Sequence, residues 1–255
     1  MNTRTVVVTG GGQGIGAATG TLLASRGYRV VVADKSESTA AAQAAVLDEK
    51  FPVEGGHVAV AVDVTDATMV DAAFANLTER FGSLEGLVNG AGVLFKAPAE
   101  ETSVDLWKLQ LDVHLTGALL CSRAAFPALA RAEQPAIVNI ASVGSTFGLP
   151  GRVAYATAKS GVLGLTRTLA VEWGKHGIRV NAVAPGYIGT EMVRAGLREG
   201  TLDEGALVRR TPLGRLGEPE EIAKVIAFLL SEEASFVHGE VLRADGGITI
   251  DGTFQ

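Results

Sequence analysis

Short apolar runs alternate with longer amphipathic segments along the whole chain. Seven of the short runs are rich in β-branched residues and almost continuously hydrophobic, which is typical of parallel strands covered by helices on both faces. The predicted strands are residues 5–9, 28–33, 57–62, 85–89, 136–141, 178–184 and 239–244. Helical patterns fill the spaces between them, for example residues 15–27, 66–82 and 160–177. Each of these three patterns ends at a glycine, as helices often do.

This regular alternation of strand and helix predicts an α/β fold. We expect a doubly wound, Rossmann-type, seven-stranded parallel sheet with helices on both faces. The sequence contains no internal repeat, low-complexity tract or linker, so residues 1–255 are expected to form a single domain. Residues 187–217 interrupt the alternation with an unusually long insertion before the next helix. Long ordered insertions in compact domains are usually functional, which predicts a substrate lid there.

The composition excludes several classes of protein. A net charge of −6 argues against a nucleic-acid or anionic-membrane surface. No apolar stretch approaches the length of about 20 residues that a membrane span needs, and the apolar run near the first residue is too short for a signal peptide. Cys121 is the only cysteine, which excludes an intrachain disulfide and suits a reducing cytoplasm. The histidines show no metal-ligand spacing, so no metal site is predicted.

A glycine-rich turn follows the first predicted strand directly. Residues 9–16 read TGGGQGIG, in which the glycines follow the spacing G-x-x-x-G-x-G rather than the familiar G-x-G-x-x-G. Glycines at such a turn bring backbone N–H groups close to a pyrophosphate at the start of a helix. Because the turn joins the first strand to the first helix of an α/β pattern, it predicts a dinucleotide site.

The second predicted strand leads to Asp34, eighteen residues after Gly16. A carboxylate at this strand end accepts hydrogen bonds from an adenosine ribose and repels a 2′-phosphate, which predicts NAD rather than NADP as the cofactor. Two considerations weaken the prediction. Asp34 alternatively caps the next helix, and the neighbouring Lys35 would soften the repulsion.

Two further features point to chemistry near the sheet edge. Residues 155–159 read YATAK, and residues four apart lie on one face of a helix, so Tyr155 and Lys159 are expected to be stacked. Taken alone, such a pair is more often simple packing. Ser142 closes the fifth predicted strand, at the carboxyl edge where sheets of this type bind their ligands.

In this order, TGGGQGIG, NGAG (89–92), Ser142 and YATAK resemble the short-chain dehydrogenase/reductase family, in its compact branch with the pattern T-G-x-x-x-G-x-G. PGYIGTEM (185–192) and ADGG (244–247) also look like that family. The resemblance implies an NAD(H)-dependent oxidoreductase of secondary alcohols and ketones. It also implies a homotetramer that packs through the helix around 110–130 and the helix with Tyr155. Small residues on these helices would permit close approach: Ala118, Ala124, Ala158 and Gly161.

The resemblance assigns cofactor contacts position by position. Asp34 would bind the adenosine ribose, while Asp63 and Val64 would flank the adenine. The remaining contacts would be Gly10, Gly12, Gly14, Ile15 and Gly16 at the pyrophosphate and adenosine side, Asn89, Ala91 and Gly92 at the fourth strand, and Pro185, Gly186, Ile188 and Thr190 at the nicotinamide end. For Asp63 and Asn89 the alternative is turn chemistry at strand ends.

The resemblance also gives Ser142, Tyr155 and Lys159 a common task. Ser142 would polarise the substrate carbonyl, and Tyr155 would act as general acid in reduction or general base in oxidation. Lowering a tyrosine pKa by about three units takes about 4 kcal/mol, which one cation about 4 Å away supplies at an effective dielectric of about 20. Lys159 is therefore expected to acidify Tyr155, and to hold the nicotinamide ribose.

One position departs from the family pattern. Residues 112–117 read DVHLTG, so His114 replaces the asparagine of a segment that usually reads N-x-x-G. In the family that asparagine helps to carry a water-linked proton route from the lysine to solvent. Histidine titrates near neutrality, so His114 is a candidate catalytic relay residue; a histidine satisfied in the helix interior is the alternative.

The residues expected near the reaction centre are apolar and predict a hydrophobic or aromatic substrate: Leu94, Phe95, Phe147, Leu149, Tyr187 and Met192. The expected lid also carries arginines that either steer an anionic substrate or form ordinary solvated surface: Arg194, Arg198, Arg209 and Arg210.

Three functions stay open. One is a general ketone reductase or alcohol dehydrogenase, and another is a 3-oxoacyl-thioester (acyl carrier protein) reductase, whose usual NADPH-linked form Asp34 disfavours. The third is a catalytically silent nucleotide-binding sensor on the same fold. The intact Ser142, Tyr155 and Lys159 count against the sensor.

Overall fold

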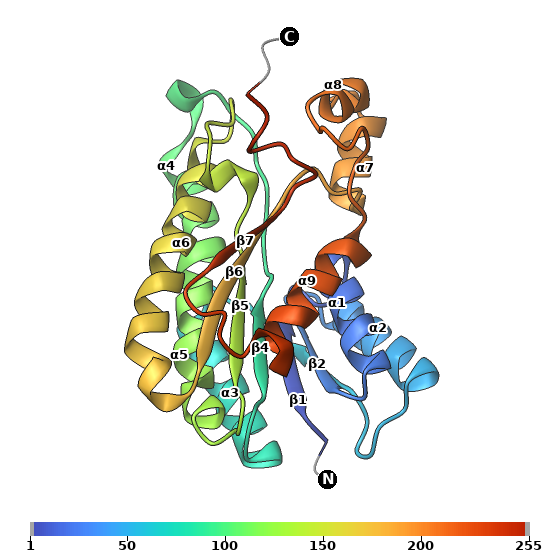
Figure 1. Ribbon diagram of the computed structural model, residues 1–255, viewed down its shortest axis with the longest axis vertical. Coiled ribbons are helices and arrows are strands. Elements are labelled where there is room, and N and C mark those ends of the chain that lie inside the picture. The colour runs from blue at the N-terminus through green and yellow to red at the C-terminus, as the bar shows by residue number, and fades with distance from the viewer. Residues whose placement is uncertain (1–2, 253–255) are drawn as a thin grey trace.

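The computed structural model describes residues 3–252, which form a seven-stranded parallel sheet with helices on both faces (Figure 1). The strand order is β3-β2-β1-β4-β5-β6-β7, and every neighbouring pair is parallel. The predicted doubly wound fold is confirmed.

All seven predicted strands are present, with ends displaced by at most two residues. They are β1 (Thr5–Thr9), β2 (Arg29–Asp34), β3 (Val58–Ala61), β4 (Gly86–Asn89), β5 (Ala136–Ile140), β6 (Arg179–Pro185) and β7 (Val241–Ala244). The long helices are α1 (Gly14–Ser25), α2 (Glu37–Lys50), α3 (Ala67–Phe81), α4 (Val104–Leu111), α5 (Gly117–Leu129), α6 (Val153–Trp173) and α9 (Pro219–Leu230). A π-helical turn (Asp112–Thr116) joins α4 to α5.

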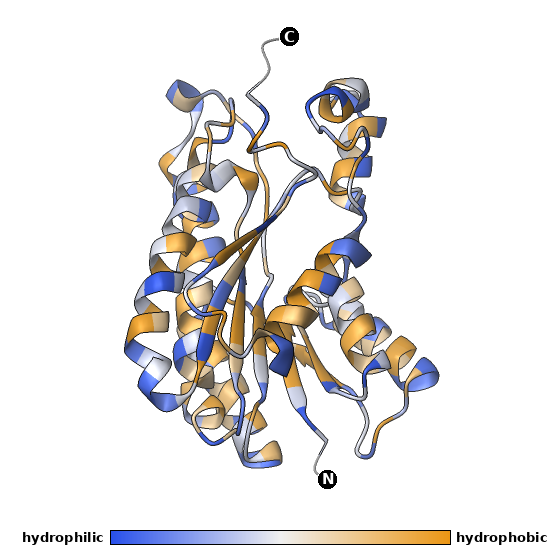
Figure 2. Ribbon diagram, in the orientation of Figure 1, coloured by the Kyte–Doolittle hydropathy of each residue, from blue (hydrophilic) through white to orange (hydrophobic). Residues whose placement is uncertain are grey.

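The sheet separates two hydrophobic cores because successive strand residues point to opposite faces. Val6 and Val8 of β1 pack against residues of α1, α2 and α9, whereas Val7 packs against residues of α3, α5 and α6. Figure 2 shows the hydrophobic strands enclosed between the two helical layers. Continuous hydrophobicity in the strands therefore reflects burial on both sides, as the sequence predicted.

Helix α6 begins at Val153, so it contains the whole YATAK segment and extends the predicted helix by seven residues toward the N-terminus. Helix α3 begins after Asp66, whose carboxylate accepts a hydrogen bond from the Met69 N–H, and it ends at Gly82 with φ of 77°. The positive φ explains the glycine at that end. Within residues 3–252, no helix is both long and apolar enough to cross a membrane.

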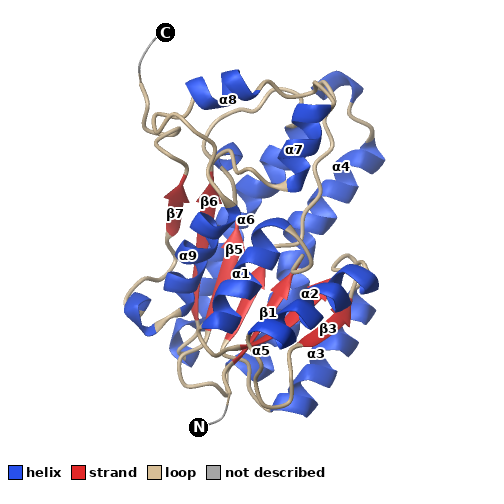
Figure 3. Cartoon of the chain, turned by 90° about the vertical axis from the view of Figure 1, so that its right-hand side faces the viewer, coloured by secondary structure: helices blue, strands red, loops and turns tan. Residues whose placement is uncertain are grey.

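Residues 187–217, here called the lid segment, contain two short helices, α7 (Glu191–Arg198) and α8 (Glu204–Arg209). In Figure 3 they lie beyond the carboxyl ends of β5 and β6. The two ends of the segment meet: the Gly217 N–H donates to the Tyr187 carbonyl at 2.9 Å, and the Gly189 N–H donates to the Gly217 carbonyl at 2.8 Å.

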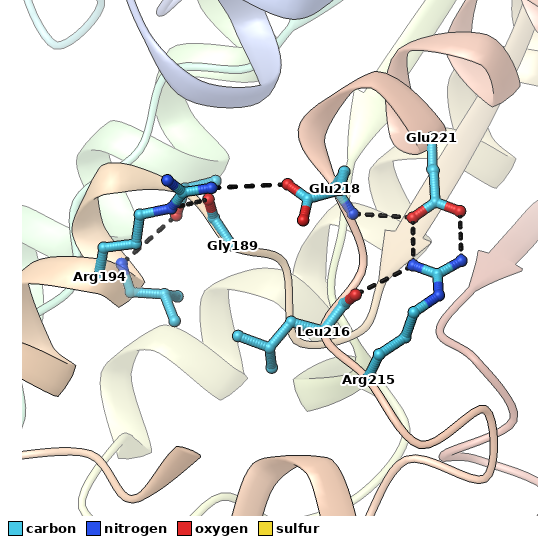
Figure 4. Close-up of polar contacts among 8 residues, drawn as sticks. Gly189, Arg194, Arg215, Leu216, Glu218 and Glu221 are labelled. Carbon is cyan, nitrogen blue, oxygen red and sulfur yellow. Dashed lines mark hydrogen bonds and ion pairs between the residues drawn. The ribbon is translucent and has the colours of Figure 1, made fainter.

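Ion pairs reinforce this junction (Figure 4). Arg194 contacts Glu218 at 3.6 Å and donates to the Gly189 carbonyl at 3.0 Å. Arg215 binds both oxygens of Glu221 at 2.7 Å, and Glu221 also accepts from the backbone N–H of Glu218 at 2.8 Å. The bidentate geometry anchors the end of the lid segment to the start of α9.

Of the small residues expected between subunits, two are buried within their own chain and two are half-buried. Ala118 and Ala158 are buried in the single chain. A Cβ on Gly161 would come within 2.7 Å of the Leu115 side chain, and Ala124 packs against the core. Ala118 and Ala158 therefore fill space between helices of one chain, and the intersubunit contact of the four residues stays a prediction.

Candidate active site

The glycine loop between β1 and α1 packs tightly against the end of β4. A Cβ on Gly10 (φ 64°) would lie 2.9 Å from the Ala91 Cα, and one on Gly16 would lie 2.1 Å from the Gly10 carbonyl oxygen. β1 and β4 are neighbours in the sheet but not consecutive in sequence, so the loop stands at the point where the strand order reverses. Sheets of this type bind their ligands in that crevice.

The outer side of the loop is equally crowded. A Cβ on Gly12 would come within 2.6 Å of the Thr39 side chain, and Gly14 (φ 55°) faces the Thr190 side chain. Ile15 packs partly into the core on the α9 side of the sheet. The loop thus forms a cradle of exposed backbone at the start of α1, which fits a pyrophosphate.

Asp34 lies at the end of β2 and points its carboxylate back to the loop. Its oxygens accept from the Gly12 N–H at 3.1 Å and from the Ser36 N–H at 3.1 Å. The cap of α2 is Ser36, whose hydroxyl accepts from the Thr39 N–H at 3.3 Å. Asp34 is therefore not the helix cap, and each of its oxygens keeps a lone pair for another donor.

Lys35 is paired with Asp63 at 2.7 Å rather than with Asp34. Asp63 also accepts from the backbone N–H and the hydroxyl of Thr65 at 3.0 and 2.7 Å. Burial works to raise the pKa of Asp63, but the hydrogen bonds from Lys35 and Thr65 outweigh it and lower the pKa. Asp63 performs the turn chemistry that was its alternative role, while the adjacent Val64 is buried against Gly117.

The Asn89 side chain turns into the protein. Its Nδ2 donates to the Ser122 hydroxyl at 2.9 Å and to Asn139 Oδ1 at 2.8 Å, and Asn139 in turn donates to the Thr166 hydroxyl at 2.9 Å. This buried network joins β4 and β5 to α5 and α6. Sequence reasoning missed Ser122, Asn139 and Thr166; their signal was a polar residue inside an otherwise apolar run.

The segment after β4 lies close to the helix carrying His114. The Thr9 hydroxyl accepts from the N–H groups of Gly90 and Ala91 at 3.1 and 3.3 Å. A Cβ on Gly92 would lie 2.7 Å from His114 Cε1, so only glycine fits between the ring and the crevice.

The predicted nicotinamide end is formed where β6 runs into the lid segment. Pro185 is the last residue of β6, and the next N–H, of Gly186, donates to the Ala244 carbonyl at 3.1 Å. Ile188 is buried, and the Thr190 hydroxyl caps α7. These residues lie opposite the glycine loop, since Thr190 contacts the position of Gly14.

Ser142, Tyr155 and Lys159 meet as predicted. Ser142 follows β5, and its Oγ accepts from the Gly144 N–H at 3.0 Å and forms a hydrogen bond with Tyr155. The Lys159 ammonium lies 5.8 Å from the centroid of the Tyr155 ring and donates to the Ile140 carbonyl at 2.5 Å. Ser142 and Lys159 are both buried.

The electrostatics differ from the expectation. Burial lowers the pKa of Lys159 to about 7, so near neutral pH about half of this side chain is uncharged. Burial raises the pKa of Tyr155 above its ordinary value, although the hydrogen bond to Ser142 and the nearby Arg152 act to lower it. Burial therefore outweighs the expected acidification of Tyr155, and the groups that act to lower its pKa are Ser142 and Arg152 rather than Lys159.

His114 is held as a neutral ring. It lies in the π-helical turn, and its Nε2 is 2.6 Å from the Val93 carbonyl, which places the hydrogen on Nε2. Burial and the charge of Lys159 lower its pKa to about 3, against the opposing effect of Val93. The ring stands at 88° to Tyr155 with centroids 5.2 Å apart, and Nδ1 is buried without a hydrogen-bond partner among residues 3–252. Burial thus favours the neutral form of His114, whose Nδ1 is an acceptor beside Tyr155.

The predicted substrate residues come from three segments, together called the opening here: the loop after β4, the stretch between Ser142 and α6, and the lid segment. Phe147 and Leu149 lie between Ser142 and α6, with Leu149 packed on Gly144. Leu94 and Phe95 lie on the loop after β4, whereas Tyr187 and Met192 lie on the lid segment. Phe95 is 42% exposed and Met192 is 51% exposed.

Sequence reasoning also missed two supports of this opening. Arg152 immediately precedes α6 and lies close enough to Tyr155 to lower its pKa. Buried Gln110 accepts from the Phe95 N–H at 3.2 Å and so fixes the loop after β4. Neither residue stands in a motif; each is identified by its tertiary contacts.

Known proteins share this architecture. A family model described as Enoyl-(Acyl carrier protein) reductase matches residues 10–249. The chain is 44% identical over 249 residues to cis-4-hydroxycyclohexanecarboxylate dehydrogenase of Sinomonas cyclohexanicum, covering 96% of each chain. It is 35% identical over 251 residues to a 3-oxoacyl-[acyl-carrier-protein] reductase of Synechocystis sp., covering 98% of each.

A solved structure agrees with these matches. The crystal structure of levodione reductase superposes with a TM-score of 0.90 at 34% identity, covering 98% of this chain and 99% of that one. The glycine cradle, the Ser142–Tyr155–Lys159 group and full-length similarity to these enzymes agree, and the chain belongs to the short-chain dehydrogenase/reductase family.

Proposed function

We propose that this protein is an NAD-linked oxidoreductase that transfers a hydride between the nicotinamide and a secondary alcohol or its ketone, with Tyr155 as the general acid or base. The meeting of Ser142, Tyr155 and Lys159 beside the glycine cradle carries this proposal. Family membership supplies the coarser statement that the chain is an oxidoreductase of alcohols and ketones with a nicotinamide cofactor.

The cradle fits a dinucleotide because Gly10, Gly12 and Gly16 allow a close turn in which a Cβ would collide with the chain, and this turn brings backbone N–H groups to the start of α1. When bound, NAD accepts or supplies the hydride. Asp34 would accept the adenosine ribose hydroxyls with its remaining lone pairs, and Lys159 would bind the nicotinamide ribose. The loop from Gly10 to Gly16 and the segment from Pro185 to Thr190 would enclose the two ends, as the resemblance implied.

In the reducing direction, burial keeps the Tyr155 phenol protonated near neutral pH, so it is ready to donate a proton to the forming alkoxide. The Ser142 hydroxyl, fixed by the Gly144 N–H, would donate to the same oxygen. In the oxidising direction Tyr155 must accept the proton, which requires added positive charge near the phenolate. Fully charged Lys159 would contribute part of it.

A spectrophotometric panel tests the proposal. It would follow NADH or NADPH at 340 nm with cyclohexanol, cis-4-hydroxycyclohexanecarboxylate and the corresponding ketones. Tyr155→Phe is expected to lower kcat at least about 1,000-fold while NADH binding stays within about twofold, because the phenol touches the substrate oxygen. Tyr28→Phe, at a tyrosine outside the site, is the control. Comparable turnover by Tyr155→Phe and the parent would refute the assigned role.

A 3-oxoacyl-thioester reductase is the second candidate. Similarity to the Synechocystis enzyme and the name of the matching family model favour it. The free carboxylate of Asp34 disfavours its usual NADPH-linked form, because a 2′-phosphate would face a negative charge. NADPH-dependent reduction of an acetoacetyl thioester, with no activity on ring alcohols, would select this candidate.

We also propose a homotetramer in the cytoplasm, with residues 1–255 as a single domain and the lid segment closing over the substrate. Exposed apolar side chains on the predicted contact helices support the assembly: Leu109, Leu119 and Val171. Light scattering that gives the mass of one subunit would refute it.

A further inference from the structure

Most arginines of the lid segment are already paired with carboxylates. Arg194 pairs with Glu218, Arg198 with Glu191, Arg209 with Asp203, and Arg215 with Glu221. Arg210 differs, because it has no carboxylate partner among the residues that the structure describes. Exposed pairs of this kind contribute little stability, but they show which side chains are satisfied by the chain itself.

Arg210 instead lies against the catalytic side of the opening. Its guanidinium carbon is 4.7 Å from the centroid of the Phe147 ring, and Phe147 is five residues after Ser142. A guanidinium that lies over a ring uses its flat face, so the N–H donors along its edge stay available. The next residue, Thr211, is buried, and its hydroxyl donates to the Leu207 carbonyl at 2.9 Å, which fixes the chain at this point.

Two further cations, Lys96 and Arg152, lie near Tyr155 and the start of α6. Ala97 and Arg152 form a parallel bridge, which places Lys96 next to the start of α6. Burial and the charge of Arg152 lower the pKa of Lys96, and Glu199 acts in the opposite direction. Arg152 also lies near the Tyr155 phenol. Neither Lys96 nor Arg152 forms an ion pair within residues 3–252.

Three cations without an ion pair among residues 3–252 thus lie along the segment from Ser142 to the start of α6, in a chain whose net charge is −6. The same segment carries apolar Phe147, which contacts Arg210, and Leu149, which packs on Gly144. This arrangement suits a molecule with a hydrocarbon body next to the reacting carbon and a negative group at its far end.

We propose that the substrate is a secondary alcohol or ketone bearing a carboxylate remote from the reacting carbon, and that Arg210 binds this carboxylate while Arg152 and Lys96 keep the opening positive. The inference rests on the proposed oxidoreductase function and adds the charge of the substrate. It gives the lid segment a direct part in selecting the substrate.

The test compares two probes of matched shape, 4-hydroxycyclohexanecarboxylate and its carboxamide. The parent enzyme is expected to prefer the acid about 10- to 100-fold in kcat/KM, the factor that a charge-assisted hydrogen bond provides. Arg210→Gln is expected to remove most of this preference and to leave kcat/KM for the carboxamide within about threefold. Arg209→Gln, at the paired neighbouring arginine, is the matched control and should change neither value.

Ionic strength gives an independent measurement. Between about 0.05 and 0.5 M salt, kcat/KM of the parent for the acid should fall, and it should fall less for Arg210→Gln, because screening acts on the charge that the variant lacks. NADH affinity should be the same in both proteins, which shows that the variant is folded.

The outcomes separate the two proposals. If the parent uses the carboxamide or cyclohexanol as well as the acid, the carboxylate inference is refuted and the oxidoreductase function stands. If Arg210→Gln lowers kcat/KM equally for the acid and the carboxamide, Arg210 contributes to the shape of the opening and does not recognise the substrate's charge. This result also refutes the inference. Absence of turnover with every alcohol and ketone and both cofactors would refute both proposals.

Discussion

We predict that the charge of Lys159 makes the protein less stable than it would be without this charge. The side chain is only 5% exposed, and burial lowers its pKa from 10.5 to about 7. At about 1.36 kcal/mol per pH unit, this difference corresponds to at most about 5 kcal/mol of unfolding free energy lost below pH 7. Replacing Lys159 by methionine removes the charge and keeps an unbranched side chain of similar size.

The hydrogen bond from Lys159 to the Ile140 carbonyl disappears as well, at a cost of about 1–3 kcal/mol. We therefore expect Lys159→Met to be about 2 kcal/mol more stable than the parent at pH 7, which raises Tm by about 4–8 °C in a chain of this length. The same variant should be inactive, so stability and activity would change in opposite directions.

The pH dependence identifies the cause. Since the folded pKa lies below the unfolded one, the unfolded chain binds one more proton between about pH 7 and pH 10.5, and the parent gains stability as pH rises through that window. Circular dichroism melts of cofactor-free protein at pH 6, 7, 8.5 and 10 would measure this. The advantage of Lys159→Met should be largest at pH 6–7 and shrink above it, whereas Lys175→Met, at an exposed lysine, should show no such trend.

Two results would contradict this reasoning. A variant that melts below the parent at pH 7 would show that the hydrogen bond to Ile140 outweighs the burial of charge. A stability difference that is constant from pH 6 to 10 would show that Lys159 does not titrate in this range.

Three further predictions concern the site. Gly16→Ala should weaken NADH binding at least about tenfold or prevent folding, because the new Cβ would lie 2.1 Å from the Gly10 carbonyl oxygen. Gly20→Ala in the same helix meets only ordinary contacts and is the control. Calorimetric titration and melting of both variants would compare them. His114→Asn should leave the midpoints of the pH profile of kcat/KM unchanged within about 0.3 unit, since a ring with a pKa of about 3 stays neutral from pH 5 to 10; a displaced midpoint would restore a titrating role. Asp34→Ser should lower affinity for NADH and raise it for NADPH, each about tenfold, in a fluorescence titration; unchanged preference would refute the role of this carboxylate.

The sequence was sufficient for the fold because the central strands are buried on both sides and almost continuously hydrophobic, as β1 and β4 show, whereas the edge strands β3 and β7 are only partly buried. The stacking of Tyr155 and Lys159 was also predictable, since it needs only helical spacing. The direction in which the pKa of Tyr155 is shifted was not predictable from the sequence. The expected shift required a cation about 4 Å from the phenol. Lys159 instead binds the Ile140 carbonyl, and desolvation has the largest effect on the pKa of both Tyr155 and Lys159.

The roles of polar residues within apolar runs also could not be predicted from the sequence. Asn89 ends a strand at the sheet edge, where a residue that faces a ligand and one that faces the interior look identical in sequence. Only the positions of Ser122 and Asn139 show that its amide points inward. In the same way, Arg209 and Arg210 are adjacent and chemically equal, and tertiary contacts alone distinguish the paired one from the other.

The junction at Tyr187, Gly189 and Gly217 bears on which changes of sequence the fold tolerates. The lid segment leaves the end of β6 and leads into α9, and backbone hydrogen bonds among Tyr187, Gly189 and Gly217 join its two ends. A change of length between α7 and α8 therefore leaves the strand register untouched. The stretch between α7 and α8 can therefore vary in length and sequence while β6 and α6 keep their positions in the fold.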